Sequence, residues 1–348
     1  MNKLQVTIVG GSGYVGGELL RLLLFHEGVE VKQVTSERFV GKPVSKIHPN
    51  LRGISKLTFS SISELKNCDT IFLCLPHGNS NKSIENYASL ANQVIDLSAD
   101  FRINNDALYK EWYGSSRENS EYKDKFVYGI PELHRKEMKT AKFISSAGCN
   151  ATTVILGLYP FFKENLVEID KTVSEAKVGT SEGGNSFSEA SHHPERSGSI
   201  RSYKPVRHRH TAEMIQELSF FGEPQIHFSA TSIEMIRGVL ATSHIFLKED
   251  LQEKDIWKLY RKYYSGEPFI RIVKERDGIY RFPDPKILIG TNYCDIGFMK
   301  DPKSNRVVII SAIDNLMKGA AGQAVQAFNI SNNFDEKTGL NFPGFHPI

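Results

Sequence analysis

The chain has 348 residues, 40% of them hydrophobic and 24% charged, which is typical of a globular protein long enough for two domains. Its formal net charge of +3 is too small to indicate a nucleic-acid-binding protein, which gathers a large basic excess on one face. The four cysteines form no C-x-x-C pair and no dense framework, so we expect reduced thiols in a cytoplasmic protein. A strand pattern begins directly after Met1 and no apolar run is long enough to span a bilayer, so we expect neither a signal peptide nor a membrane partner.

The N-terminal half alternates between strand and helix patterns. A β-branched run at 6–9 leads into a glycine-rich turn and then into leucines at helical spacing through 15–25. Further apolar runs follow at 29–34, 70–75 and 94–97, and polar helical stretches such as 81–90 lie between them. This alternation predicts an α/β fold with a parallel, doubly wound sheet, that is, a Rossmann domain formed by residues 1–148 and 315–348.

The pattern changes after residue 148. Long β-type runs now dominate, at 173–178, 225–230, 238–247 and 307–312. They predict a second, α+β domain at 149–314, built on a mixed and largely antiparallel sheet. An alanine-rich helical pattern at 318–328 follows the last strand, and we expect it to pack back on the first domain.

A G-x-G-x-x-G pattern lies between the first strand and the first helix, at Gly11, Gly13 and Gly16. Bare glycine lets the backbone approach a pyrophosphate, whose charge then lies at the helix N-terminus. We therefore predict dinucleotide binding, and the alternative is a purely structural turn. The residues expected to contact the cofactor here are Gly10, Gly11, Ser12, Gly13, Tyr14, Val15 and Gly16.

The end of the second strand bears on the choice between NAD and NADP. It lies about twenty residues after the glycines, where NAD enzymes usually offer an acidic residue to the ribose. This chain has Val34, Thr35 and Ser36 there, followed by Glu37 and Arg38. Hydroxyls and an arginine suit a 2′-phosphate, so we predict NADP(H). In the alternative, Arg38 is a solvated charge and Glu37 binds the ribose.

Cys149 is the candidate nucleophile. It follows a small, flexible turn and precedes the apolar helical run 154–159. The positive end of a helix dipole favours the thiolate at such a position. The alternative is a buried structural thiol, as we expect for Cys68, Cys74 and Cys294, which lie in or beside β-type segments.

A cysteine nucleophile needs a base, and His208 and His210 alternate with Arg207 and Arg209, before what looks like a capped helix start at 211–213. Either histidine can take the thiol proton or protonate a leaving group. Such a pair alone is more often a polar surface feature, but the flanking arginines suit the negative charge of an acyl phosphate. His192 and His193 lack thiolate or carboxylate ligands at a recognisable spacing, so we expect no metal.

Several longer motifs resemble those of one family. They are GGSGYVGGELL at 10–20, LPHG at 75–78, DLSADFR at 96–102, YGIPEL at 128–133, GCNAT at 148–152, HRH at 208–210, IRG at 236–238 and DNLMKGAAG at 314–322. Together they resemble the N-acetyl-gamma-glutamyl-phosphate reductases over nearly the whole chain, and more narrowly their carrier-protein-dependent relatives in lysine and arginine biosynthesis. The resemblance implies an NADPH-dependent reductase that converts an acyl phosphate to an aldehyde through a thioester on Cys149.

The resemblance also implies roles for single residues. Cys149 is the nucleophile, His208 the base, and His210 a substrate or acid-base partner. The thioester oxygen needs a fixed hydrogen-bond donor, for which we consider the Cys149 amide or Asn150. The remaining expected contacts are Tyr203 and Arg237 on the substrate side, and Leu75, Pro76, His77 and Asn315 on the cofactor side, with Asn315 closing over the nicotinamide.

One departure from the family pattern concerns the substrate. The acetyl-glutamyl enzymes typically have Asn-Pro-Gly-Cys before the helix, whereas this chain has SAGC at 146–149. The change looks like the branch whose substrate is attached to a small acidic carrier protein, LysW. The stretch 190–205 is longer and more basic than we expect for an enzyme of a free metabolite, and its alternative is a plain solvated loop. The cations expected to hold the carrier are Arg196, Arg201, Lys204, Arg207 and Arg209.

Several alternatives stay open. The enzyme could reduce free N-acetyl-glutamyl phosphate, or be a more distant acyl-phosphate reductase of the aspartate-semialdehyde type. A different class is a non-catalytic NADP-binding sensor with a structural cysteine. Within the carrier branch, the sequence does not separate aminoadipyl from glutamyl phosphate. The resemblance implies a homo-oligomer, either a dimer or a tetramer.

Overall fold

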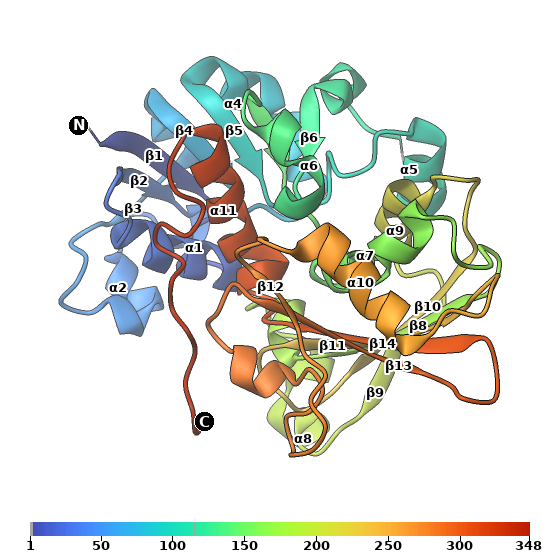
Figure 1. Ribbon diagram of the computed structural model, residues 1–348. Helices are drawn as coiled ribbons and strands as arrows, with labels where there is room; N and C mark the ends of the chain where they lie inside the picture. Colours follow the sequence, from blue (N-terminus) through green and yellow to red (C-terminus); the bar gives the residue numbers. More distant parts are fainter. Residues whose placement is uncertain (1–2, 115) are drawn as a thin grey trace. The chain divides into compact units, whose positions relative to one another are not determined.

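The structure is a computed structural model that describes residues 3–114 and 116–348 (Figure 1). Contacts within the chain divide it into two compact units. The first unit runs to Ala147 and includes Ala320–Phe342, and the second comprises Gly148–Gly319 and Pro343–Ile348. The described part of the chain holds no helix that is both long and apolar enough to span a bilayer.

The first unit is built on a seven-stranded sheet in the order β3-β2-β1-β4-β5-β7-β6. All of its strand pairs are parallel. The order runs outward in both directions from the β1-β4 pair, which makes the carboxyl ends of these two strands the topological switch point of the sheet. The strands are β1 Leu4–Val9, β2 Val29–Thr35, β3 Phe59–Ser60, β4 Cys68–Leu73, β5 Ala91–Asp96, β6 Phe126–Tyr128 and β7 Phe143–Ser145.

In the described part of the first unit, seven α-helices connect and cover these strands. They are α1 Tyr14–Leu24, α2 Val44–Ile47, α3 Asn79–Lys82, α4 Ile84–Leu90, α5 Asp106–Tyr113, α6 Pro131–Met138 and α11 Gly322–Ser331. The stretch predicted as helical at 81–90 is helical, but Ser83, with φ −123° and ψ 15°, divides it into α3 and α4.

The C-terminal helix differs from its prediction in its bounds. The segment Met317–Ala321 is a π-helical turn, and the α-helix proper begins only at Gly322. Residues 322–330 are buried on every side, and α11 contacts α1 and α6, as expected for an alanine-rich helix without a polar face. The Phe328 ring lies 5.6 Å from the Phe72 ring of β4, so this late segment is part of the core of the first unit.

The second unit is built on another seven-stranded sheet, in the order β12-β13-β14-β11-β8-β10-β9. The pairs β8-β10 and β12-β13 are parallel and the other four are antiparallel. The predicted fold class, a Rossmann domain joined to an α+β domain with a largely antiparallel sheet, is confirmed. The strands are β8 Thr172–Val178, β9 Arg201–Lys204, β10 Ile226–Ser232, β11 Val239–Phe246, β12 Ile270–Ile272, β13 Cys294–Lys300 and β14 Arg306–Ile313.

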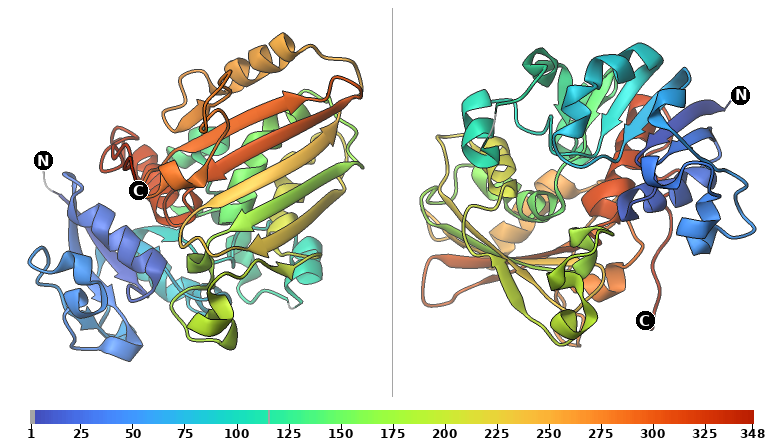
Figure 2. Two further views of the ribbon diagram at one scale, coloured as in Figure 1. Left: turned by 90° about the horizontal axis from the view of Figure 1, so that it is seen from below. Right: turned by 180° about the vertical axis from the view of Figure 1, so that it is seen from behind.

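Helices cover one face of this second sheet (Figure 2, left). The α-helices of the unit are α7 Cys149–Lys163, α8 His193–Arg196, α9 His210–Leu218 and α10 Glu253–Tyr264. Helix α7 contacts β11, β13 and β14, and it comes so close to β14 that a Cβ on Gly157 would lie 2.4 Å from Ser311 Oγ. Every second residue of β11 is buried and its neighbours are half-buried, so the other face of the sheet is only partly covered.

Candidate functional site

The turn between β1 and α1 has the shape of a dinucleotide-binding turn. Gly10 has a φ of +80°, and a Cβ there would lie 2.5 Å from the Cys74 carbonyl oxygen. A Cβ on Gly16 would lie 2.7 Å from the Cα of Gly11. Gly13 is the N-cap of α1, and a Cβ on it would have no neighbour within 4 Å. The fold itself therefore requires Gly10 and Gly16, whereas Gly13 leaves the helix N-terminus open to a pyrophosphate.

Other predicted cofactor residues support this turn. Thr35 Oγ1 accepts a hydrogen bond from the Gly10 amide at 3.3 Å, and the Ser36 hydroxyl donates to Ser12 Oγ at 2.9 Å. Val34 is buried under the turn, 2.2 Å from where a Cβ on Gly11 would stand. In the first turn of α1, Tyr14 is exposed and Val15 is half-buried.

Glu37, the acidic residue after β2, forms hydrogen bonds within the fold. The Glu37 carboxylate accepts hydrogen bonds from the Ile62 amide at 2.6 Å and from Ser61 Oγ at 3.2 Å, so it is committed to the turn after β3. Arg38 is exposed, with its guanidinium carbon 5.1 Å from the Phe39 ring centroid. This edge therefore presents a guanidinium rather than an uncommitted carboxylate, an arrangement that suits a phosphate better than a ribose diol.

The loop after β4 adjoins the glycine turn at the switch point. A Cβ on Gly10 would lie 3.2 Å from Leu75 Cδ2, and Pro76 and His77 follow at the same edge. The Nδ1 atom of His77 lies 2.7 Å from Asp100 Oδ1. Burial alone raises the pKa of Asp100, but hydrogen bonds from His77 and from the Gly78 and Asn81 amides outweigh it and lower the pKa. Asp100 thus fixes the orientation of His77.

Two further residues support this unit and had no predicted role, although Asp96 opens the DLSADFR motif. His48 Nε2 lies 2.8 Å from the Gly11 carbonyl oxygen, and its ring lies 2.4 Å from where a Cβ on Gly17 would stand. Asp96, at the end of β5, is fully buried and accepts hydrogen bonds from the hydroxyls of Ser80 and Ser98. Burial raises the pKa of Asp96 to about 6, and the nearby charge of Asp100 contributes to the rise.

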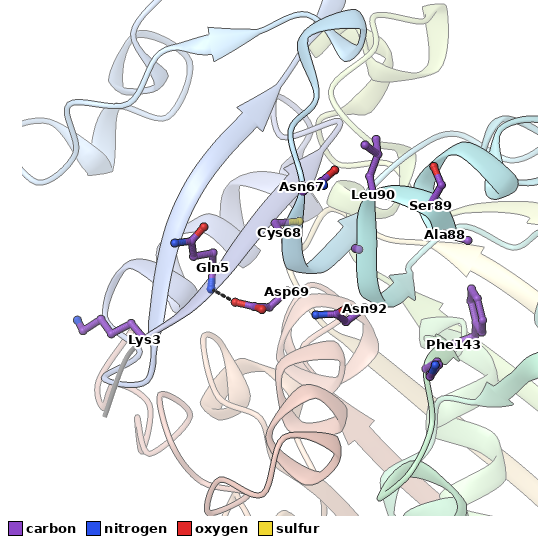
Figure 3. A pocket seen from close by; sticks show the side chains of 12 residues that line it. Lys3, Gln5, Asn67, Cys68, Asp69, Ala88, Ser89, Leu90, Asn92 and Phe143 are labelled. Carbon is purple, nitrogen blue, oxygen red and sulfur yellow. Dashed lines mark hydrogen bonds between the residues drawn. The ribbon is translucent and has the colours of Figure 1, made fainter.

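A hollow of about 820 Å³ lies at the opposite end of the same sheet (Figure 3). Gln5 and Asp69 lie at the amino ends of β1 and β4, and the Gln5 amide donates to Asp69 Oδ2 at 2.8 Å. Cofactors of doubly wound sheets bind at the carboxyl ends of the strands. The hollow is therefore not a candidate cofactor site. Among the residues that the structure describes, no group of three or more His, Cys, Asp or Glu side chains is placed to hold a metal ion.

In the second unit, Cys149 is the first residue of α7 and is partly exposed. Its N-cap, Gly148, has an extended backbone with φ −71° and ψ 146°. The π-helical turn closes behind the thiol, since a Cβ on Gly319 would lie 2.6 Å from the Cβ of Cys149. The backbone on both sides thus fixes the sulfur at the positive end of the helix.

The predicted capped start of α9 is wrong. The helix begins at His210, and its N-cap residue Arg209 forms no side-chain capping hydrogen bond. Glu213 closes no capping box. It is fully buried, and its Oε2 accepts the Gly148 amide at 2.8 Å while its Oε1 lies 3.9 Å from His210 Nε2. Glu213 therefore links the start of α7 to His210, a role that sequence reasoning missed.

His208 belongs to a second polar group. Its Nδ1 accepts the main-chain N–H of His210 at 3.1 Å, and its Nε2 lies 3.8 Å from Glu182 Oε1. The Tyr203 hydroxyl donates to the same Glu182 oxygen at 2.5 Å. Desolvation of the Tyr203 hydroxyl raises its pKa far above the ordinary value, and the charges of Glu182 and Cys149 add to the rise. The structure thus brings Cys149, Tyr203 and His208 into one neighbourhood.

Three further predicted residues lie in the same unit. Asn150 is fully buried, and neither atom of its amide group has a hydrogen-bond partner among the described residues. Asn315 accepts from the Gly238 amide at 2.7 Å and donates to Ser181 Oγ at 2.9 Å, so it braces the turn after β8. Arg237 Nε lies 2.9 Å from the buried Asp314.

Some cations of the basic stretch form hydrogen bonds within the protein, and others are exposed. Arg196 donates to the Ile233 carbonyl and, at 3.1 Å, to Ser199 Oγ, so its guanidinium holds the loop together. Lys204 is exposed, as are Arg207 and Arg209 around His208. Arg201 donates to the Glu195 carbonyl at 2.8 Å. It also borders a hollow of about 590 Å³ lined by Phe187, Glu189, Ala190, His192, Glu195 and Arg201.

A dinucleotide-binding unit joined to a unit with a helix-terminal cysteine and two histidines defines an oxidoreductase of the nicotinamide-dependent class. Residues 5–141 match the family described as semialdehyde dehydrogenase, NAD binding domain. Residues 149–315 match the one described as semialdehyde dehydrogenase, dimerisation domain. The chain therefore belongs to the semialdehyde dehydrogenase family.

Curated relatives resemble the chain over nearly its whole length. It is 53% identical to a putative [LysW]-L-2-aminoadipate 6-phosphate reductase from Thermomicrobium roseum, over 99% of both chains. It is 49% identical to the [LysW]-L-2-aminoadipate 6-phosphate reductase of Deinococcus radiodurans, again over 99% of both. A [LysW]-L-2-aminoadipate/[LysW]-L-glutamate phosphate reductase from Saccharolobus solfataricus is 49% identical with the same coverage. These relatives confirm the family resemblance drawn from the motifs.

Solved structures share the fold. Aspartate semialdehyde dehydrogenase II from Vibrio cholerae superimposes with a TM-score of 0.72 at 16% identity, covering 96% of this chain and 99% of the other. The aspartate semialdehyde dehydrogenase of Candida albicans gives a TM-score of 0.68 at 15% identity, covering 95% and 99%. At such low identity the likeness establishes the architecture alone.

Proposed function

We propose that the chain is an NADPH-dependent reductase of carrier-linked acyl phosphates. Its substrates are [LysW]-aminoadipyl 6-phosphate, [LysW]-glutamyl 5-phosphate or both, and the product is the semialdehyde, in lysine or arginine biosynthesis. The observation that carries the proposal is the partly exposed Cys149 at the start of α7, in the same neighbourhood as His208 and Tyr203. The names of relatives up to 53% identical support the choice of substrate.

The reaction begins when the Cys149 thiolate attacks the acyl carbon. A C–S bond forms, the C–O bond to the phosphate breaks, and inorganic phosphate leaves with the electron pair. NADPH, when bound, supplies a hydride to the same carbon. As the aldehyde forms, the C–S bond breaks and the thiolate is restored. His208 and His210 are the candidates for moving the thiol proton and for donating to the departing phosphate.

Negative charge develops on the thioester oxygen during reduction. The Cys149 amide, in the first turn of α7, and the unsatisfied amide of Asn150 are the donors proposed for it. Arg237 and Tyr203 are the proposed contacts to the rest of the substrate.

NADP is the proposed cofactor because Glu37 is committed to the turn after β3 while Arg38 is exposed beside Ser36. A guanidinium binds a 2′-phosphate through charge-assisted hydrogen bonds. The pyrophosphate is proposed to lie over Gly13, and His77 and Asn315 to contact the nicotinamide end.

The proposed carrier surface combines the exposed cations Lys204, Arg207 and Arg209 with the hollow beside Arg201. Exposed Phe187, 79% accessible, adds apolar area at the rim of that hollow. Cations of this kind steer and hold an acidic partner. Arg196 is proposed to act indirectly, by keeping the loop in shape.

The family description of the second unit supports a homo-oligomer. The partly covered face of its sheet is the proposed interface, since Val173 on β8 and Met299 on β13 are 46% and 43% exposed. A dimer and a tetramer both fit this arrangement.

The test is an assay of NADPH consumption with three substrates supplied in turn: carrier-linked aminoadipyl phosphate, carrier-linked glutamyl phosphate and free N-acetyl-glutamyl phosphate. NADH is the cofactor control. Turnover of the carrier-linked compounds alone is the expected result. Turnover of the free compound contradicts the carrier requirement, and a Cys149→Ala protein with full activity contradicts the covalent mechanism and favours an NADP-binding sensor.

A further inference from the structure

We propose that Glu182 is a positioning residue that holds His208 and Tyr203 as hydrogen-bond donors, so that His208 is not the base that takes the Cys149 proton. The inference rests on the proposed function and deepens it. It leaves His210, beside Glu213, as the proton acceptor.

The turn Thr180–Gly183 follows β8 and is held from several sides. The Thr180 amide donates to the Met235 carbonyl at 2.8 Å, and the Ser181 amide donates to the Ile236 carbonyl at 3.0 Å. Ser181 Oγ also accepts from the Asn315 amide group at 2.9 Å. Glu182 therefore projects from a fixed piece of backbone, and its carboxylate is defined in position before any ligand binds.

Both neighbours of the carboxylate meet the same oxygen. Tyr203 donates its only hydroxyl proton to Glu182 Oε1 at 2.5 Å, and His208 Nε2 lies 3.8 Å from that oxygen. The side chain of Glu182 is 22% exposed and that of His208 is 8% exposed, so water screens their attraction only in part. The carboxylate oxygen is a hydrogen-bond acceptor, so the nitrogen that faces it is suited to be a donor.

The other ring nitrogen of His208 determines the tautomer. Nδ1 accepts the main-chain N–H of His210 at 3.1 Å, and a ring nitrogen that accepts an N–H carries no proton of its own. The neutral ring therefore has its proton on Nε2, where Glu182 lies. For Nε2 to accept a proton from Cys149, the ring would have to become protonated on Nδ1 and lose the hydrogen bond from the His210 amide.

Tyr203 is equally unsuited to be a base. Desolvation of the hydroxyl, the charge of Glu182 and the hydrogen bond to it together raise the pKa of Tyr203, so the hydroxyl stays protonated. Glu182 thus faces two donors, and the Nε2–H of His208 is the one that remains only loosely engaged, at 3.8 Å. That N–H can donate to the leaving phosphate or to the substrate carbonyl as charge develops there.

The first experiment does not depend on the substrate. The rate at which iodoacetamide alkylates Cys149 at neutral pH is measured by peptide mass mapping, which separates Cys149 from Cys68, Cys74 and Cys294. His208→Gln keeps N–H donors but cannot act as a base, so we expect alkylation at the wild-type rate. His210→Gln is expected to slow it. Slowing by His208→Gln to the level of His210→Gln overturns the proposal, even if the proposed substrate is wrong.

The second experiment uses turnover. Glu182→Gln and Tyr203→Phe are expected to lower kcat about 10-fold to 100-fold with little change in the KM for NADPH, the scale seen when one transition-state donor is lost. His208→Gln is expected to retain more kcat than His208→Ala, because the glutamine restores a donor. Glu223→Gln, an exposed acid on the same unit, is the matched control. An unchanged kcat in Glu182→Gln overturns the positioning role, and absence of turnover in the wild type counts against the proposed substrate instead.

Discussion

The main chain at Gly319 lies directly against the side chain of Cys149. A Cβ on Gly319 would stand 2.6 Å from the Cβ of Cys149 and 3.2 Å from its Cα. Real side chains do not approach so closely, so either the π-helical turn or the start of α7 must move when residue 319 gains a methyl group. The position of the thiol thus depends on a glycine 170 residues later in the chain.

We therefore expect Gly319→Ala to lower kcat by about 10-fold to 100-fold, because small misplacements of a nucleophile are costly. The substitution should also destabilise the second unit by roughly 1–3 kcal/mol. Gly157→Ala is the matched control, since a Cβ there meets Ser311 Oγ at 2.4 Å without touching Cys149. Thermal unfolding and the alkylation rate of Cys149 measure both effects, and equal loss of reactivity in the two variants contradicts the argument.

Arg38 is expected to set the cofactor preference. Arg38→Ala removes a charge-assisted contact to the 2′-phosphate, so the KM for NADPH should rise about 10-fold or more while the KM for NADH stays the same. Steady-state assays with both cofactors measure the ratio. Glu37→Gln is the control, because that carboxylate serves the Ile62 amide and the substitution should change stability rather than preference. A gain of NADPH selectivity in Glu37→Gln shows that the acid, not Arg38, faces the ribose.

The sequence predicted those parts of the site that are built from consecutive residues. The turn from Gly10 to Gly16 and the cysteine at a helix start each fit within one short segment, where φ restrictions, helix caps and apolar spacing are visible. It did not predict contacts made across the fold. Glu182 and Tyr203 are 21 residues apart, and Gly148 and Glu213 are 65 apart, so no local period places them together.

The predicted starts of the last helix and of α9 were wrong for a related reason, since both depend on contacts between distant residues. Lys318 lies in an alanine-rich segment with good helix propensity, yet the chain forms a π-helical turn there, in which Gly319 lies against Cys149. At 211–213 no capping box forms, because the Glu213 carboxylate is buried and accepts the Gly148 amide instead of a helix N-terminal amide.

Glu213 offers a test of that buried contact. Glu213→Ala leaves the Gly148 amide without its acceptor, a loss of roughly 1–3 kcal/mol of stability, and it also releases His210. Glu213→Gln keeps one acceptor oxygen and should recover most of the stability but not all of kcat. Urea unfolding and turnover of the two variants distinguish these effects. Equal kcat in the glutamine variant and the wild type means that only the hydrogen bond to Gly148, and not the charge near His210, matters.

The raised pKa of Asp96 predicts that the stability of the protein depends on pH in the acid range. Burial raises its pKa from 3.8 to about 6, so between these values the folded protein binds more protons than the unfolded chain. The contribution of this residue is therefore present below pH 3.8 and is lost as the pH rises through about 6. Two pKa units correspond to at most about 3 kcal/mol, and Asp100, whose pKa is lowered, works in the opposite sense.

Asp96→Asn carries no titratable proton, so it should remove this part of the slope. We expect the difference in thermal midpoint between variant and wild type to shift in favour of the variant as the pH is raised from 4 to 7. The asparagine oxygen can still accept from Ser80 and from the main-chain N–H of Ser98, although its NH2 group faces the Ser98 hydroxyl donor and costs some stability at every pH. Midpoints measured at several pH values separate that constant cost from the pH-dependent term. A difference that is the same at all of them means that Asp96 does not hold its extra proton in the folded protein.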